Sequence, residues 1–205
     1  MEQISPTRTE LLTRKSQIKL AQQGADLLRG KREALVREFL GEIRSFRMER
    51  DEMLRGLTEA VQSLMRSLSI DGSEAVAAAG LAARKGLEVE VAEQNIWGTR
   101  VAEVKTDFSV RDPQDRGYSV VGTSARVDET VERFEETLER ILKVAPKQQK
   151  LTRLAEEIRK TSRRVNALEQ RLLPSLNEQV RYIRGVLDQR EREDVFRLKR
   201  IKGKR

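Results

Sequence analysis

Apolar side chains recur with helical spacing through most of the first 70 residues, and this run constrains the fold more than any other feature of the sequence. Their average spacing is about 3.6 residues, the period of an α-helix. Arg32 and Arg50 fill the two gaps in the run. The apolar positions are Leu28, Leu35, Phe39, Ile43, Phe46, Leu54, Leu57, Val61, Leu64 and Leu68. The sequence therefore predicts one very long helix at the N-terminal end.

Both ends of this helix carry recognisable signals. Ser5 can cap the free backbone amides, and Pro6 suits the first helical position, where its missing N–H costs nothing. Asp71-Gly72 predicts the end of the helix. A continuous helix from Ser5 to Leu68 would be roughly 95 Å long at about 1.5 Å per residue. We therefore expect an extended rod rather than a compact domain.

A second long helix is predicted to begin near Ser124, with Asp128 and Glu129 close to its positive N-terminal end. Its apolar positions repeat about every 3.5 residues, the period of a coiled coil. They are Val127, Val131, Phe134, Leu138, Leu142, Ala145, Ile158, Val165, Leu168, Leu172, Val180, Ile183, Leu187 and Leu198. Because each proline removes a backbone hydrogen bond, we expect Pro146 and Pro174 to bend or break this helix locally.

A long helix with one apolar stripe needs a partner, so the simplest fold pairs these two helices with each other. The predicted fold is mainly α: a long antiparallel two-helix coiled coil formed by the N- and C-terminal helices, with a small middle cap. The predicted parts are a helix over residues 1–70, a cap over 71–123 and a helix with a basic tail over 124–205. This pairing brings the two termini to one end.

The middle segment differs in pattern from both helices. An Ala-rich stretch from Glu74 to Ala83 predicts a short helix. Alternating residues then predict two short strands, one at Leu87, Val89 and Val91 and one at Val104, Thr106, Phe108 and Val110. The turn signals are Gly98, Asp112-Pro113 and Gly117. We expect a β-hairpin in this cap, with Trp97 either filling its core or anchoring a partner protein.

Composition argues against an enzyme. The chain contains no Cys and no His, so it lacks thiolates and the commonest metal ligand and catalytic base. The stretch Gly24–Arg32 resembles a phosphate-binding loop, but the spacing of its glycines is wrong and no strand precedes it. We predict no catalytic residue, cofactor site or metal site, and no apolar stretch approaches the ~20 residues needed to span a membrane.

Glycines inside the first helix have two interpretations. Gly24, Gly30, Gly41 and Gly56 each cost about 1 kcal/mol relative to alanine in a helix. They either mark places where another helix comes close or are simply tolerated, and the sequence alone favours neither interpretation.

Almost all of the net charge of +8 lies in the C-terminal tail, where six of the last ten residues are Lys or Arg. Antiparallel pairing would place basic residues of both helices at one tip. These residues are Arg8, Arg14, Lys15, Lys19, Arg197, Lys199, Arg200 and Lys202. Such a tip can meet nucleic acid, an anionic membrane surface or an acidic protein, and charge alone does not choose among them.

One internal stretch resembles a known family. The residues Arg163, Arg164, Val165, Asn166, Ala167, Leu168 and Glu169 are similar to the most recognisable stretch of the D subunit of V-type and archaeal A-type ATP synthases. The resemblance continues through Glu191–Asp194 and Phe196–Lys202, and includes Ser5–Arg8 and Asn95–Gly98. It spans nearly the whole chain, although Pro146 falls where this family is expected to have an uninterrupted helix.

This resemblance implies a central-stalk rotor subunit that transmits torque and does no catalysis of its own. The coiled coil would stand in the pore of the A/B catalytic hexamer, with the F subunit on its side. Its lower end would rest on the C subunit, also named d, which sits on the ion-translocating membrane ring. The eight basic residues would contact the hexamer, and Trp97 would belong to the cap that contacts a partner. The chain would lie at the cytoplasmic side of the cell membrane, as a peripheral component without direct membrane insertion.

Two alternatives come from other classes of protein. A coiled-coil stalk of a flagellar-type export ATPase would share the long helices but not the Arg163–Glu169 stretch. A basic coiled coil that binds nucleic acid would show affinity that falls steeply with salt concentration. The resemblance favours neither, and it implies no nucleic-acid partner.

Overall fold

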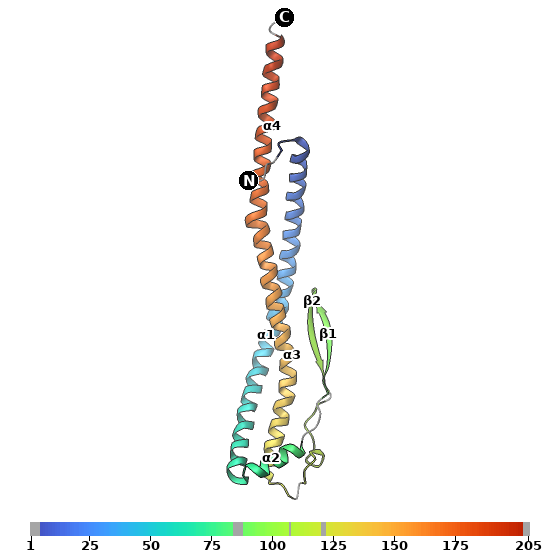
Figure 1. Ribbon diagram of the computed structural model, residues 1–205, viewed down its shortest axis with the longest axis vertical. Helices are drawn as coiled ribbons and strands as arrows, with labels where there is room; N and C mark the ends of the chain where they lie inside the picture. Colours follow the sequence, from blue (N-terminus) through green and yellow to red (C-terminus); the bar gives the residue numbers. More distant parts are fainter. Residues whose placement is uncertain (1–4, 84–87, 107, 120–121, 203–205) are drawn as a thin grey trace. The chain divides into compact units, whose positions relative to one another are not determined.

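The computed structural model describes residues 5–83, 88–106, 108–119 and 122–202 (Figure 1). The predicted strand residue Leu87, the first residues Met1–Ile4 and the last residues Gly203–Arg205 lie outside the described residues. The chain divides into two compact units, one made of Met1–Ala34 with Glu157–Arg205 and the other of Leu35–Glu156.

Helix α1 runs from Arg8 to Asp71 and confirms the predicted long N-terminal helix. It begins later than predicted, because Thr7 rather than Ser5 caps it. The Thr7 hydroxyl accepts a hydrogen bond from the backbone N–H of Glu10 at 3.2 Å. The Thr7 carbonyl accepts one from the backbone N–H of Leu11 at 3.0 Å. At the other end, Gly72 has a φ of 85°, which stops the helix at Asp71 as the sequence predicts.

In the first unit, α1 lies antiparallel to the C-terminal part of the chain. Helix α3 spans Ala125–Ala167, a π-helix η2 spans Leu168–Leu172 and α4 spans Leu173–Lys202. As residue numbers rise along α1, those of the ion-pair partners fall: Arg8 pairs with Glu191 at 2.5 Å, Arg29 with Glu169, and Lys31 with Glu157 at 2.9 Å. The buried side chains between the helices include Ala21, Ala25, Val165, Leu176, Val180 and Ile183.

In the second unit, α1 and α3 are also antiparallel. Lys150 contacts Glu38 at 2.8 Å and Glu42 at 2.7 Å, and Arg126 contacts Asp71 at 3.3 Å. Leu35 and Leu154 are fully buried in this unit. The predicted antiparallel two-helix pairing is therefore present within each unit.

The apolar pattern predicts the buried face of α1 only in part: Leu35 is fully buried as predicted, but the prediction is wrong at three positions nearer the end of the helix. Leu54, Val61 and Leu68 were expected in the pairing stripe, but 38–45% of their surface is exposed. Small residues are buried in their place: Gly56, Ala60, Ser63 and Ser67. Small side chains allow two helices to approach closely, and the larger apolar side chains then lie beside the contact rather than in it.

The two prolines have different consequences. Helix α3 continues through Pro146, so of the predicted bend or break at this position the break does not occur. Near Pro174 the helix changes type: it widens into the π-helix Leu168–Leu172 just before the proline, and the N–H of Leu173 donates to the carbonyl of Leu168. A proline ring clashes with the carbonyl four residues earlier, and the wider π turn relieves this clash.

The middle segment contains the predicted short helix and the predicted hairpin. Helix α2 spans Ser73–Ala82. Strands β1, Glu90–Ile96, and β2, Thr99–Lys105, form one antiparallel hairpin (Figure 1). The second strand starts earlier than predicted, because the turn has only two residues, Trp97 and Gly98, and pairing resumes at Thr99. The predicted strand residues after Lys105 are therefore not paired, and a short 3-10 helix, Pro113–Asp115, follows.

Candidate functional site

Trp97 lies at the turn of the hairpin and is 62% exposed, so the prediction that it fills the cap's core is wrong. Its φ is 51° and that of Gly98 is 80°, as a two-residue hairpin turn of type I′ requires. A bulky residue at positive φ is strained, and asparagine or glycine is the usual choice there. Nothing in the hairpin's packing explains a tryptophan at this position, which leaves partner contact as its predicted role.

The predicted basic tip divides into two groups. Arg8, Arg14, Lys15 and Lys19 lie in the first turns of α1, where Arg8 pairs with Glu191 and Arg14 pairs with Glu10 at 2.8 Å. The guanidinium of Arg190 also donates to the carbonyl of Pro6 at 3.3 Å. The start of α1 therefore lies beside the residues around Glu191 in α4.

The second basic group lies in α4 beyond Glu191, past the residues that pair with the start of α1. Every residue of α4 from Arg192 to Lys202 is exposed, over roughly 16 Å at about 1.5 Å per residue. This segment carries the predicted contact residues Arg197, Lys199, Arg200 and Lys202. It also exposes four large apolar side chains, which are Val195, Phe196, Leu198 and Ile201. A helix end with both kinds of side chain exposed is suited to a partner that offers apolar contacts and carboxylates.

The recognisable stretch Arg163–Glu169 spans the end of α3 and the start of the π-helix. Val165 is buried against α1, and Glu169 pairs with Arg29 of α1. Arg163, Arg164, Asn166 and Ala167 are exposed, while Leu168 is half-buried. Part of this stretch therefore holds the helix pair together, and part is free to contact another protein.

A second apolar row runs along α1 beside the contact with α3. Leu40, Leu54, Val61 and Leu68 fall at heptad intervals with Arg47, and their exposed fractions range from 38 to 61%. Arg44, Arg55 and Arg66 are exposed on a different face of α1, at eleven-residue steps, which is three helical turns. Sequence reasoning assigned Leu54, Val61 and Leu68 to the pairing stripe and did not include Leu40, so it missed this surface.

A groove of about 520 Å³ opens beside the same row in the second unit. Its wall is mostly apolar and comes from three helices, with Leu57 and Leu64 from α1, Val76 from α2, and Phe134 and Leu138 from α3. Leu57 and Leu64 alternate with the exposed residues of the row along α1. The row and the groove therefore form one continuous apolar surface.

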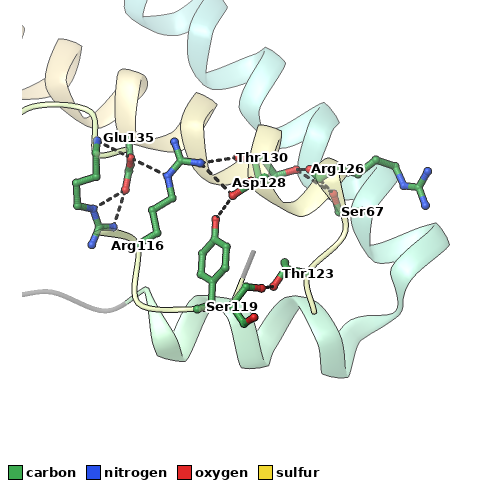
Figure 2. Close-up of polar contacts among 10 residues, drawn as sticks. Ser67, Arg116, Ser119, Thr123, Arg126, Asp128, Thr130 and Glu135 are labelled. Carbon is green, nitrogen blue, oxygen red and sulfur yellow. Dashed lines mark hydrogen bonds and ion pairs between the residues drawn. The ribbon is translucent and has the colours of Figure 1, made fainter. Parts of the chain in front are cut away.

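A buried polar cluster, which sequence reasoning also missed, joins the segment after the hairpin to α3 (Figure 2). The Glu135 carboxylate pairs with Arg111 at 2.5 Å and with Arg116 at 3.5 Å. Arg116 also pairs with Asp128 at 3.1 Å, and the Tyr118 hydroxyl donates to the same Asp128 carboxylate. Only 3% of the Arg116 side chain and 7% of the Glu135 side chain are exposed.

The surroundings of Arg116 and Tyr118 favour the protonated form of both side chains. Burial alone would lower the pKa of Arg116, but hydrogen bonds with Tyr118 and Asp128 and the nearby charge of Glu135 outweigh it and raise that pKa. Burial and the hydrogen bond to Asp128 raise the pKa of the Tyr118 hydroxyl. Near neutral pH the cluster therefore contains a charged Arg116 and a neutral Tyr118, which suits a structural joint rather than proton transfer.

Metal clusters and membrane-spanning helices are both missing from the described part of the chain. Within residues 5–83, 88–106, 108–119 and 122–202, no group of three or more Asp and Glu side chains is arranged to hold a metal ion. None of the helices described is both long enough and apolar enough to cross a membrane.

Comparison with known sequences decides the family. The family model that describes the D subunit of ATP synthase matches residues 10–203. The chain belongs to this family. Its match to the D subunit includes the Arg163–Glu169 stretch, Trp97 and every predicted basic contact residue except Arg8.

Curated relatives agree with this assignment along the full length. The chain is 45% identical to the D subunit of the V-type ATP synthase of Thermus thermophilus, covering 100% of this chain and 90% of the relative. It is 41% identical to the D subunit of the A-type ATP synthase of Thermococcus sibiricus, covering 98% and 94%. It is 37% identical to the A-type D subunit of Methanoregula boonei, covering 100% and 98%. The family resemblance is confirmed, and this D-subunit chain is a component of a V/A-type ATPase.

Proposed function

We propose that this chain is the central-stalk rotor subunit of its ATPase. In this role it transmits torque between the A/B hexamer, which makes or hydrolyses ATP, and the ion-translocating membrane ring. The chain itself does no catalysis. It works at the cytoplasmic side of the cell membrane as a peripheral component, with the F subunit and the C subunit as its other partners.

The exposed end of α4 is the observation that carries this proposal. The segment Arg192–Lys202 presents Phe196, Leu198 and Ile201 together with Lys199 and Arg200, and all of these side chains are exposed. Exposed apolar side chains in this number mark a binding surface. We assign this surface and the basic start of α1 to the pore of the hexamer, where carboxylates would meet the Lys and Arg side chains.

The apolar row on α1 is the surface that we assign to the F subunit. Its large side chains, Leu54, Val61 and Leu68, are partly exposed and suit the apolar face of a partner helix. The cap with Trp97 at its hairpin turn is the part that we assign to the C subunit, above the membrane ring.

Torque transmission follows from a mismatch of symmetry. A single chain inside a ring of three A/B pairs cannot present the same surface to all three catalytic interfaces. It therefore stabilises a different conformation at each interface, and turning it exchanges those conformations. Because such coupling is reciprocal, closure of an interface on nucleotide also drives the rotor round.

A reversible cross-link tests the rotor role directly. The chain has no native cysteine, so one cysteine can be introduced at Phe196 and joined to a cysteine in one catalytic subunit of the assembled complex. Rotation requires that multi-turnover ATP hydrolysis stops when the link forms and recovers when it is reduced. The matched control carries the Phe196→Cys change without a partner cysteine, and its turnover should be the same before and after the oxidant is added. Continued turnover with complete cross-linking would rule out a rotor role.

A further inference from the structure

We propose that Glu135 is a positioning residue that fixes both ends of the hairpin segment to α3. In the proposed function the hairpin carries the partner-contact residue Trp97, so the last arm of the test below rests on that function. The joint itself is argued only from contacts within Leu35–Glu156.

Arg111 connects Glu135 to both chain ends of the hairpin. Its backbone N–H donates to Oε2 of Glu135 at 3.1 Å, and its Nε donates to Oε1 at 2.7 Å. Its Nη1 donates to the carbonyl of Ala83 at 3.1 Å, directly after α2. Arg111 follows β2 and Ala83 precedes β1, so one guanidinium holds the chain on its way into the hairpin and on its way out.

Arg116 makes a second attachment to α3. Its guanidinium lies between Glu135, at 3.5 Å, and Asp128, at 3.1 Å, and it also donates to the backbone carbonyl of Asp128 at 3.3 Å (Figure 2). Gly117 follows at a φ of 85°, and a Cβ there would lie 2.5 Å from the carbonyl oxygen of Ala82. The segment after the hairpin therefore packs closely against the end of α2 and is held to α3 by ion pairs.

Burial makes these attachments specific to one geometry. A buried carboxylate between two guanidinium groups has a large desolvation cost, which only well-placed hydrogen bonds offset. Glu135 accepts such bonds from Arg111 and faces Arg116 on its other side. Removing its charge would leave the buried Arg116 and the half-buried Arg111 without their shared partner, and the hairpin ends would lose their common anchor.

Two neighbouring carboxyl groups on α3 provide a matched comparison. Glu135→Gln removes a charge that is 7% exposed, while Glu136→Gln removes one that is 46% exposed and pairs with Arg140 at 3.4 Å. Trp97 is the only tryptophan, so its fluorescence anisotropy reports on the hairpin turn alone. Hydrogen exchange of the full chain reports separately on α1, on α3 and on residues 99–119.

In Glu135→Gln we expect exchange within residues 99–119 to be at least about tenfold faster than in Glu136→Gln, because a buried charge pair has been broken. The anisotropy of Trp97 should fall, and exchange in α1 should stay unchanged. Glu135→Asp, which keeps the charge, should restore part of the protection. Equal exchange in the two glutamine variants would overturn the proposal, as would a uniform rise along α1 and α3.

A second variant covers the case in which Glu135→Gln does not fold. Arg111→Gln leaves the contact between Glu135 and Arg116 in place and removes the bridge to Ala83. We expect it to speed exchange in β1 and β2 while residues 113–119 stay protected. Unchanged protection of both strands in this variant would overturn the bridging role of Arg111.

The assembled ATPase separates the joint from the proposed function. If the hairpin contacts the C subunit, Glu135→Gln should weaken retention of that partner relative to Glu136→Gln. A hairpin that is loosened in the free chain with full retention of the C subunit would confirm the joint and overturn the assignment of Trp97 to that partner. A hairpin that is not loosened overturns the joint and leaves the rotor role standing.

Discussion

At the scale of single residues, the glycines of α1 separate into two kinds. A Cβ on Gly56 would meet the guanidinium of Arg140 and would lie 3.5 Å from the Thr137 hydroxyl, so α1 and α3 come close there. A Cβ on Gly24, Gly30 or Gly41 would meet nothing within 4 Å. Of the two interpretations that the sequence leaves open, close contact holds for Gly56 and tolerance holds for the other three.

Alanine should therefore stabilise the chain at the three open positions. We expect Gly24→Ala, Gly30→Ala and Gly41→Ala each to raise the free energy of unfolding by about 0.5–1 kcal/mol, because alanine loses less backbone entropy in a helix. Urea unfolding of the full chain measures this. Gly117→Ala is the opposing control: its positive φ and the nearby Ala82 carbonyl should make it destabilising. Destabilisation at Gly24, Gly30 and Gly41 would show that these positions are not open.

The Lys31–Glu157 pair predicts a pH dependence of stability. The hydrogen bond from Lys31 lowers the pKa of Glu157, so the pair stabilises the fold fully above the unfolded pKa of about 4.3. That stabilisation is lost as the pH falls through the lower, folded pKa. Relative to Glu157→Gln, the native chain should be more stable by on the order of 1 kcal/mol near pH 7.

Unfolding experiments between pH 7 and about pH 3 test this expectation, since the range brackets the carboxyl pKa values. The difference between the native chain and Glu157→Gln should shrink toward zero at the acid end. The neighbouring Glu156→Gln serves as control, because Glu156 is 48% exposed and its contact with Arg153 is longer, at 3.6 Å. A difference from Glu157→Gln that stays constant with pH would contradict the assignment.

At the scale of elements, hydroxyl groups join α1 to α3. Thr130 donates to the carbonyl of Arg126 at 2.8 Å, and its oxygen lies 2.8 Å from the Ser63 hydroxyl and 2.9 Å from the Ser67 hydroxyl. All three side chains are buried. A buried polar group in a helix pair fixes the register, because sliding one helix would leave these hydroxyls without partners.

Replacing the central hydroxyl tests this register contact. Thr130→Val keeps the shape and removes the oxygen, so we expect a loss of about 1–3 kcal/mol in the free energy of unfolding. Thr130→Ser keeps the oxygen and should lose clearly less. The midpoint of urea unfolding measures both changes. A valine variant as stable as the native chain would show that the hydroxyls contribute nothing to the pairing.

The long helices and the hairpin could be predicted because their signals are repetitive and local. Helical periodicity identified α1 and α3, and Asp71-Gly72 identified the end of α1. The start at Thr7 and the strand β2 were misplaced, since neighbouring residues offered equally good caps and alternations. The contact between the helices was misassigned for a different reason: Gly56, Ala60, Ser63 and Ser67 carry little apolar signal, although they are the residues that face α3.

The candidate site was only partly accessible from sequence. Basic residues near the chain ends and the exposed parts of the Arg163–Glu169 stretch were visible as charge and as a family pattern. The cluster of Arg111, Arg116 and Glu135 was not, because isolated charged residues in a loop and on a helix resemble solvated surface. Only the fold brings them together and buries them. A proline two residues beyond Leu172 was the one local signal for the π-helix.

At the scale of the whole molecule, positive charge is concentrated at the end of α4, where the side chains are exposed. The exposed segment Arg192–Lys202 carries Lys199, Arg200 and Lys202 in its last turn. We expect the combined change of these three residues to Glu to weaken assembly with the A/B hexamer or to uncouple hydrolysis from ion transport, because like charges would then face the carboxylates of the pore.

Co-purification with the hexamer and the ratio of ions moved to ATP hydrolysed measure this effect. The control reverses the same number of charges at Arg140, Lys143 and Arg153 in α3, within the second unit. That variant should assemble and couple like the native chain. Full assembly and full coupling after reversal of Lys199, Arg200 and Lys202 would show that this segment does not contact the hexamer.

The apolar row on α1 also affects how the chain behaves when it is produced alone. Leu40, Leu54, Val61 and Leu68 are exposed, and exposed apolar side chains of this size tend to associate with one another in water. The isolated chain should therefore self-associate as its concentration rises, and a co-expressed partner that covers the row should keep it dispersed. We therefore expect co-expression with its partner subunits to give better-behaved protein than expression of the chain alone.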